Sequence, residues 1–176
     1  CALPISALRV RVQEGSLEML LPELRARRLD VVVARWPRGR KTEDLEEQAL
    51  YEEPMAVVCA PSHPLTRARP LRWQALGDYP WILPPEGSAV RADLEELFRV
   101  RRLAPRDSGI ECASPFAISV LLAELQALAV CPRAIAVHLE ADGLLTRLPL
   151  PLPKVFGPNS AMTLRGSDPT PAMQAF

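Results

Sequence analysis

The stretch that decides the fold runs from residue 8 to residue 36 and reads LRVRVQEG, SLEMLLPELRARR and LDVVVARW. Apolar and polar residues alternate over residues 8–13, which predicts a half-exposed strand. Leucines then recur at helical spacing behind Ser16, a predicted N-cap. Residues 29–34 form a short apolar run, broken only by Asp30, typical of a parallel strand buried on both faces. Together they predict a right-handed βαβ crossover, which opens at the sheet edge where such folds bind small molecules.

Strand and helix patterns keep alternating along the rest of the chain. Short apolar runs at residues 54–60, 80–83 and 127–131 predict further buried strands. Ser88 and Ser114 each stand in front of a helical pattern as candidate N-caps, and a proline follows Ser114 at the first helical position. This alternation predicts an α/β fold.

The order of the elements predicts two Rossmann-like lobes. In PSHPL, at residues 61–65, prolines on both sides of a Ser-His pair favour a stiff crossover. We expect residues 1–60 and 146–176 to form lobe I and residues 61–145 to form lobe II. Two crossovers would join the lobes around a central ligand cleft. The charged stretch at residues 37–48 is predicted to be a solvated loop or a short exposed helix.

The charge balance argues against a nucleic-acid clamp. The 176 residues include 21 Lys plus Arg and 21 Asp plus Glu, so the formal net charge is zero. A domain that holds DNA through its phosphates normally carries a basic surplus. The sequence shows no apolar run near the ~20 residues of a membrane span and nothing that resembles a signal peptide. We therefore expect a cytoplasmic protein without membrane contact.

The cysteines and histidines lack the close pairs that a metal site requires. They are Cys1, Cys59, Cys112, Cys131, His63 and His138. Three of the cysteines lie in apolar runs, which favours small core residues in a reducing compartment. The sequence also contains no G-x-S-x-G elbow and no glycine-rich phosphate loop. No catalytic residue, metal or cofactor is predicted.

Several motifs, in order and over nearly the whole chain, resemble the effector-binding (regulatory) domain of LysR-type transcriptional regulators. They are LRVRVQEG (8–15), LPELRARRLDVVV (21–33), EEPMAVVCAPSHPL (52–65), LRWQALGDYPW (71–81), Glu111 with Ser114, ALAVCPR (127–133) and LPL (148–150). The resemblance implies a periplasmic-binding-protein-like (type 2) fold that binds a small organic effector between its lobes. It implies control of transcription through lobe movement, homodimers, and tetramers of the full-length protein.

The chain departs from the family pattern in three places. The N-terminal winged helix-turn-helix, through which such regulators bind DNA, is absent, so this chain would be a fragment. Glu124, Leu125 and Gln126 stand where the family usually has glycines. Residues 1–7 resemble the family's first strand and turn, yet the helix expected before Leu8 is missing. We therefore expect residues to be missing between Ala7 and Leu8.

Five side chains at predicted strand ends are candidates for effector binding: Ser6, Ser16, Arg35, Ser88 and Ser114. Hydroxyls and helix N-termini suit a polar or anionic molecule, and the Arg35 fork suits a carboxylate. The alternatives stay open, because the serines can be ordinary turn or N-cap residues and Arg35 a surface ion-pair partner. Solvent exposure is favoured for Arg91, and a core position for Phe116.

Two other function classes compete with the regulator. A solute-binding protein of a transport system would share the fold, but it would normally carry a secretion signal. A small α/β enzyme would need a nucleophile, metal or phosphate loop, which the sequence does not show. A basic helix-turn-helix segment preceding the chain would favour the regulator, and an apolar signal would favour the transport protein.

Overall fold

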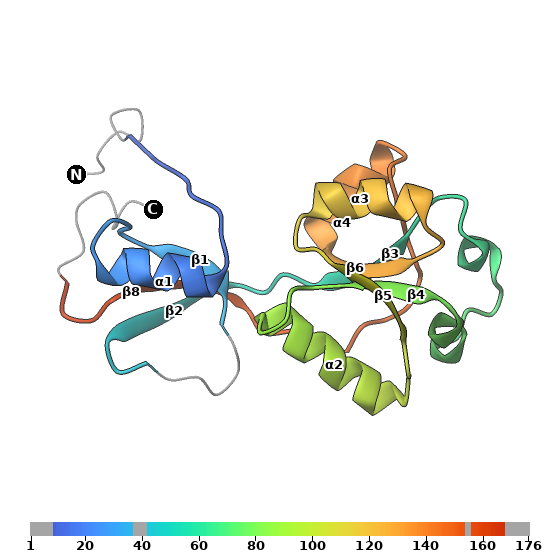
Figure 1. Cartoon of the computed structure of the whole chain (residues 1–176), viewed down its shortest axis with the longest axis horizontal. Coiled ribbons are helices and arrows are strands. Elements are labelled where there is room, and N and C mark those ends of the chain that lie inside the picture. Colours follow the sequence, from blue (N-terminus) through green and yellow to red (C-terminus); the bar gives the residue numbers. More distant parts are fainter. Residues whose placement is uncertain (1–8, 37–41, 154–155, 168–176) are drawn as a thin grey trace. The chain divides into compact units, whose positions relative to one another are not determined.

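The computed structural model describes residues 9–36, 42–153 and 156–167, and Figure 1 shows their helices and strands. The chain divides into two compact units, each with its own sheet. Unit 1 comprises Cys1–Tyr51 and Pro158–Phe176, and unit 2 comprises Glu52–Gly157. Both units contain helices packed on a sheet, in agreement with the predicted α/β class.

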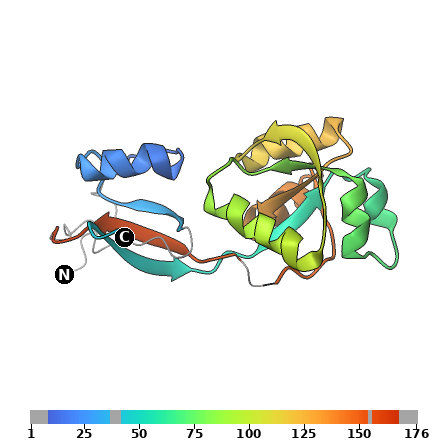
Figure 2. The same ribbon diagram turned by 60° about the horizontal axis from the view of Figure 1, so that its bottom comes forward.

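Unit 1 is built on a three-stranded antiparallel sheet in the order β1-β8-β2. Its strands are β1 (Val32–Arg35), β2 (Leu45–Tyr51) and β8 (Asn159–Leu164). The helix α1 (Leu17–Arg25) supplies Leu20, Leu21 and Leu24 to a core that also contains strand residues of the sheet. The leucine spacing therefore forms the expected helix, and its apolar side is buried against the sheet (Figure 2).

The predicted βαβ crossover at the start of the chain is wrong for the described residues. Residues 9–15 form no strand, and Val10 and Val12 are 71% and 80% exposed. Within the described part, β1 pairs only with β8, in antiparallel register, and Val33 on it is 41% exposed. Period-2 alternation becomes a strand only where a neighbour supplies hydrogen bonds and a core covers the apolar side. The described part of the chain supplies neither to residues 9–15.

The charged stretch contains a strand that the sequence analysis missed. β2 begins at Leu45, and every later residue of it is exposed. It pairs with β8 across most of its length. Because an exposed edge strand buries almost nothing, its sequence carries no hydrophobic period, and the backbone pairing alone defines it.

Unit 2 has a five-stranded mixed sheet in the order β5-β4-β6-β3-β7. Its strands are β3 (Met55–Cys59), β4 (Pro80–Leu83), β5 (Arg106–Glu111), β6 (Leu128–Pro132) and β7 (Thr146–Arg147). β4 runs parallel to β5 and β6, whereas β3 runs antiparallel to β6 and β7. The other elements are the α-helices α2 (Ala89–Arg101), α3 (Pro115–Glu124) and α4 (Arg133–Ala141), and the 3₁₀ helices η2 (Pro64–Arg67) and η3 (Trp73–Asp78).

Helices cover both faces of this sheet, with α2 on one face and α3 and α4 on the other (Figure 1). Under α2, the buried Trp81 meets Phe98 edge-on, with ring centroids 4.8 Å apart. The Trp81 indole Nε1 donates to the carbonyl of Leu76 at 3.2 Å. On the other face, Ile82 packs in one cluster with Ile118 and Leu122. β4 is therefore buried on both faces of the sheet, and β5 pairs with it as the edge strand.

The predicted lobe boundaries need correction at both crossovers. Residues 54–60 and 146–157 were assigned to lobe I, but β3 pairs with β6, and β7 pairs with β3, so both segments belong to unit 2. An apolar run shows that a strand is buried but does not show which sheet it joins. The PSHPL segment consequently lies inside unit 2, where His63 caps η2 and is 1% exposed.

Candidate functional site

The carboxyl ends of β4 and β5 in unit 2 carry two of the predicted site residues. α2 follows β4 and α3 follows β5, and each helix begins behind a serine N-cap. The Ser88 Oγ accepts from the Arg91 amide at 3.2 Å, and the Ser114 Oγ accepts from the Ala117 amide at 3.4 Å. The Cys112 amide donates to the carbonyl of Leu83 at 2.9 Å, which ties the two strand ends together.

A charged cluster stiffens this edge of unit 2. Arg91 Nη1 donates to Glu111 Oε1 and to the carbonyl of Pro84, both at 3.1 Å. The other carboxylate oxygen of Glu111 accepts from the Glu86 amide at 3.2 Å. Arg91 Nε donates to Glu95 at 2.6 Å, and these carboxylates raise the pKa of the guanidinium. Glu111 thus bridges the end of β5 to the loop that precedes α2.

The expectation of a solvent-exposed Arg91 is therefore wrong, because its side chain is only 18% exposed and engaged on several sides. Phe116 differs from its prediction in the opposite direction. It is 64% exposed on α3, although a core position was favoured. Spacing along one helix cannot show that Arg91 reaches Glu111 on a separate strand, so no pattern in the sequence marks this bridge.

The remaining predicted residues belong to unit 1. Ser16 stands at the N-cap position of α1, but its side chain makes no capping hydrogen bond and is exposed. Arg35 ends β1 and is 9% exposed, so it is a buried residue rather than a surface one. Ser6 and the junction between Ala7 and Leu8 lie outside the described residues.

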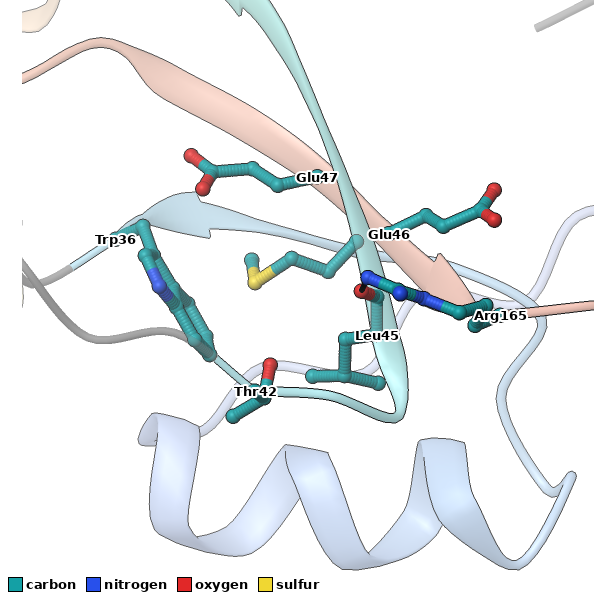
Figure 3. A pocket seen from close by; sticks show the side chains of 7 residues that line it. Trp36, Thr42, Leu45, Glu46, Glu47 and Arg165 are labelled. Atoms are coloured by element: carbon teal, nitrogen blue, oxygen red, sulfur yellow. Dashed lines mark hydrogen bonds between the residues drawn. The ribbon is translucent and has the colours of Figure 1, made fainter.

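The structure also contains a hollow that the sequence analysis did not predict. It measures about 570 Å³ and is lined by Trp36, Thr42, Leu45, Glu46, Glu47, Met162 and Arg165. Figure 3 shows Trp36 and Glu47 on one side of β2, and Glu46 and Arg165 on the other, so the hollow wraps around an edge strand. The buried Ser160 hydroxyl already donates to Glu47 at 2.7 Å. Of the predicted site residues that the structure describes, none lines this hollow.

The described cysteines are free thiols, two of them deep in unit 2. Burial raises the pKa of Cys59 to about 12 and that of Cys131 to about 11, so both thiols stay protonated at neutral pH. Cys112 is half-buried, one residue beyond the end of β5. The described residues include no group of three side chains arranged to hold a metal ion. In the same part of the chain, no helix is both long and apolar enough to cross a membrane.

A model of the LysR substrate binding domain family matches residues 6–176. The chain belongs to this family. Among its curated relatives is the "HTH-type transcriptional regulator GbpR" of Azospirillum brasilense, which is 32% identical over 81% of this chain and 42% of the relative. The "HTH-type transcriptional regulator GalR" of Pseudomonas putida is 29% identical over 96% of this chain and 42% of that relative. This LysR-family chain thus spans less than half the length of these relatives.

Solved structures of LysR-type domains share the fold. The effector binding domain of QuiR in complex with shikimate superposes with a TM-score of 0.76 and 21% identity, covering 92% of this chain and 74% of that one. The Synechocystis CcmR regulatory domain in complex with 2-PG gives a TM-score of 0.74 and 23% identity, with coverages of 90% and 75%. The predicted resemblance and the periplasmic-binding-protein-like (type 2) fold class are confirmed by these matches.

Proposed function

We propose that this chain is the ligand-sensing domain of a LysR-type transcription regulator and that its effector is a small polar or anionic organic molecule. The observation that supports this most directly is the pair of serine-capped helices beginning at the tied ends of β4 and β5. Each capping oxygen accepts from a backbone amide, which leaves its O–H free to donate to a ligand. The neighbouring helix N-termini add a positive potential that favours oxygen-rich ligands.

In this proposal Ser88 and Ser114 bind the effector from unit 2, and Ser16 binds it from unit 1. Ser16 makes no capping bond, so its hydroxyl can both donate and accept. Arg35 and Ser6 remain proposed contacts. An effector that contacts both units binds most tightly to the arrangement in which both sets of contacts form. It shifts the population towards that arrangement only by the difference between its affinities for the possible arrangements. Effector and DNA affinities of the full-length regulator would then be coupled reciprocally.

The two solved domains in complex with shikimate and 2-PG are consistent with an effector of this class. The curated relatives carry the names of HTH-type regulators, which supports a transcription regulator over a solute-binding protein of a transport system. The proposal includes a cytoplasmic location and DNA binding through an N-terminal helix-turn-helix in a longer protein.

Thermal-shift screening of small organic acids against the chain, followed by calorimetry, tests this function. An effector present at 100 times its Kd should stabilise the chain by about 2.7 kcal/mol. Ser16→Ala is the cleanest variant, because it removes a hydroxyl without breaking a cap, and affinity should fall by about 0.5–1.5 kcal/mol. Ser88→Ala should show a similar loss of affinity and, in addition, about 1 kcal/mol lower stability from the lost cap.

Ser167→Ala is a suitable control for these variants. The Ser167 hydroxyl donates to the carbonyl of Leu164 in the turn after β8 and has no predicted role in binding. Its effector affinity should equal that of the unmodified chain. An effector that binds Ser16→Ala and Ser88→Ala with unchanged affinity would contradict the proposed site and leave both serines as helix-start residues.

We also propose that the chain forms homodimers, and that the full-length protein forms tetramers. In the dimer, α1 of one copy would pack antiparallel against unit 2 of its partner. Met19 on α1 is 62% exposed, and α3 exposes Phe116 and Val120, one helical turn apart, at 64% and 53%. Large apolar side chains exposed together in this way mark surfaces that bind other proteins.

A further inference from the structure

A surface of unit 2, at the end of α2 opposite to Ser88, concentrates unpaired positive charge. Two segments supply it: residues 66–72, which lead from η2 to η3, and residues 101–106, which lead from the end of α2 into β5. The arginines of this surface are Arg67, Arg69, Arg72, Arg101, Arg102 and Arg106. We call it the arginine surface. All six are exposed except Arg101, which is half-buried.

Three contacts join the second segment to η3, which directly follows the first segment in the chain. The Arg101 guanidinium lies 5.2 Å from the ring centre of Trp73, and Trp73 is the residue that follows Arg72. Arg106 Nη1 donates to the carbonyl of Asp78, at the end of η3, at 3.4 Å. The space next to Gly77 is filled by Leu103, whose methyl carbon would lie 3.2 Å from a Cβ added there. Figure 1 shows η3 as the nearer of the two 3₁₀ turns to the C-terminal end of α2.

None of the six guanidinium groups pairs with a carboxylate among the residues that the structure describes. Arg69 and Arg106 donate to backbone carbonyls, and Arg101 covers an aromatic ring. Arg99, next to the surface, differs because it pairs with Glu96. Asp78 and Asp107 are the acidic residues nearest to these segments in the sequence, against six arginines within them. In a chain of zero formal net charge, this is a marked local excess.

We propose that the arginine surface binds the phosphate backbone of duplex DNA without reading its sequence. Guanidinium groups without carboxylate partners are well suited to phosphate oxygens. Arg101 covers one face of Trp73, which is buried, so the surface offers no aromatic platform on which an unpaired base could stack. Backbone contact with a duplex fits this composition better than recognition of single strands.

The choice of DNA over an acidic protein rests on the proposed function, because a regulator bound at its operator keeps its ligand-sensing domain tethered near DNA. Linkage of that kind lets contacts that are weak in isolation contribute to binding, since the local concentration of the partner is high. Because the formal net charge of the chain is zero, the chain alone is expected to bind DNA weakly. Its dissociation constant at low salt should be on the order of 10⁻⁵ M.

Fluorescence anisotropy of the 176-residue chain with a labelled duplex of random sequence, about three helical turns long, tests this inference. Binding at low salt, about 20 mM NaCl, should weaken steeply towards about 200 mM. Arg72→Glu with Arg102→Glu should weaken binding at least about tenfold. It should also make the slope of log K against log salt shallower by about 2, roughly 0.9 for each phosphate that the variant no longer neutralises. Arg72→Lys with Arg102→Lys should retain most of the affinity.

A charge-matched control carries Arg9→Glu with Arg133→Glu, two exposed positions outside the arginine surface. If the control loses as much affinity as the surface variant, or if the unmodified chain does not bind the duplex at low salt, the inference is overturned. Labelled poly-glutamate tests whether the partner is an acidic protein instead. Tight binding of this peptide without binding of the duplex would assign the surface to an acidic protein. The DNA-binding assay needs no effector, so a negative result there can be distinguished from a negative result in the effector screen that tests the proposed function.

Discussion

His63 shows how one buried side chain links three segments of unit 2. Its Nδ1 accepts from the Leu65 amide at 3.2 Å, and its ring lies 4.4 Å from that of Tyr79. Burial lowers the pKa of His63, and the nearby backbone of Gln126 acts in the opposite direction. An imidazole that accepts at Nδ1 must be neutral there, so protonation would break the cap of η2.

This arrangement predicts that stability falls at mildly acidic pH. The unfolded chain takes up a proton on His63 near pH 6.5, whereas the folded chain binds it only at lower pH. Unfolding is therefore favoured as the pH drops below about 6.5, by up to about 1.4 kcal/mol per pH unit. In His63→Asn, where the asparagine can still cap, urea unfolding between about pH 7 and 5 should show a shallower dependence. His138→Asn, at an exposed helix position, is the matched control. Equal slopes in all three proteins would contradict the role of His63.

At the scale of single residues, the sequence predicted where side chains stand along the elements better than it predicted which other side chains they contact. Ser88 and Ser114 do cap helices at strand ends, because an N-cap is defined by local spacing. The Arg91–Glu111 bridge joins a helix to a strand 20 residues later, and no local pattern reports such a contact. Ser16 occupies the predicted position but makes no cap, which depends on side-chain rotation rather than on sequence.

The helix α3 illustrates the same limit at the scale of elements. Its sequence, PFAISVLLAE, is apolar on every side, so the spacing of its residues cannot show which side faces the core. The structure buries Ile118 and Leu122 and leaves Phe116 and Val120 outside. Strands behaved similarly, because β2 has no hydrophobic period, whereas residues 9–13 have one without forming a strand.

The exposed side of α3 predicts the outcome of a charge substitution. Phe116→Glu should dissociate the proposed dimer while changing the free energy of unfolding by no more than about 0.5 kcal/mol, because the side chain is mostly in solvent. Sedimentation velocity at several concentrations measures the effect. Val100→Glu, at a position 54% exposed on α2 on the other face of the sheet, is the matched control and should stay dimeric. A monomeric unmodified chain, or equal dissociation of the control, would rule out α3 as the interface.

At the scale of the whole chain, the two units have separate hydrophobic cores. Leu24 lies in the core of unit 1, and Leu97 lies in the core of unit 2. Both are almost fully buried, so truncation to alanine should cost about 2–5 kcal/mol in the unit concerned. The sequence predicted two units correctly in number, but it placed β3 in the wrong one, since burial alone does not identify a sheet.

Calorimetric unfolding should therefore resolve two transitions. Leu24→Ala should lower the midpoint of one transition, and Leu97→Ala should lower the midpoint of the other. The two single variants serve as controls for each other, because each leaves one core intact. A single transition that both substitutions shift by the same amount would show that the chain unfolds as one cooperative unit.

The difference between the thiols of unit 2 offers a practical route to observing the effector. Cys59 and Cys131 are buried and protonated, so maleimide reagents should react slowly with them. Cys112 is more accessible and lies two residues before Ser114. Once Cys1 is replaced by serine, a single environment-sensitive dye at Cys112 would report from the edge where α3 begins. The protein would thereby become its own fluorescent sensor for the proposed effector.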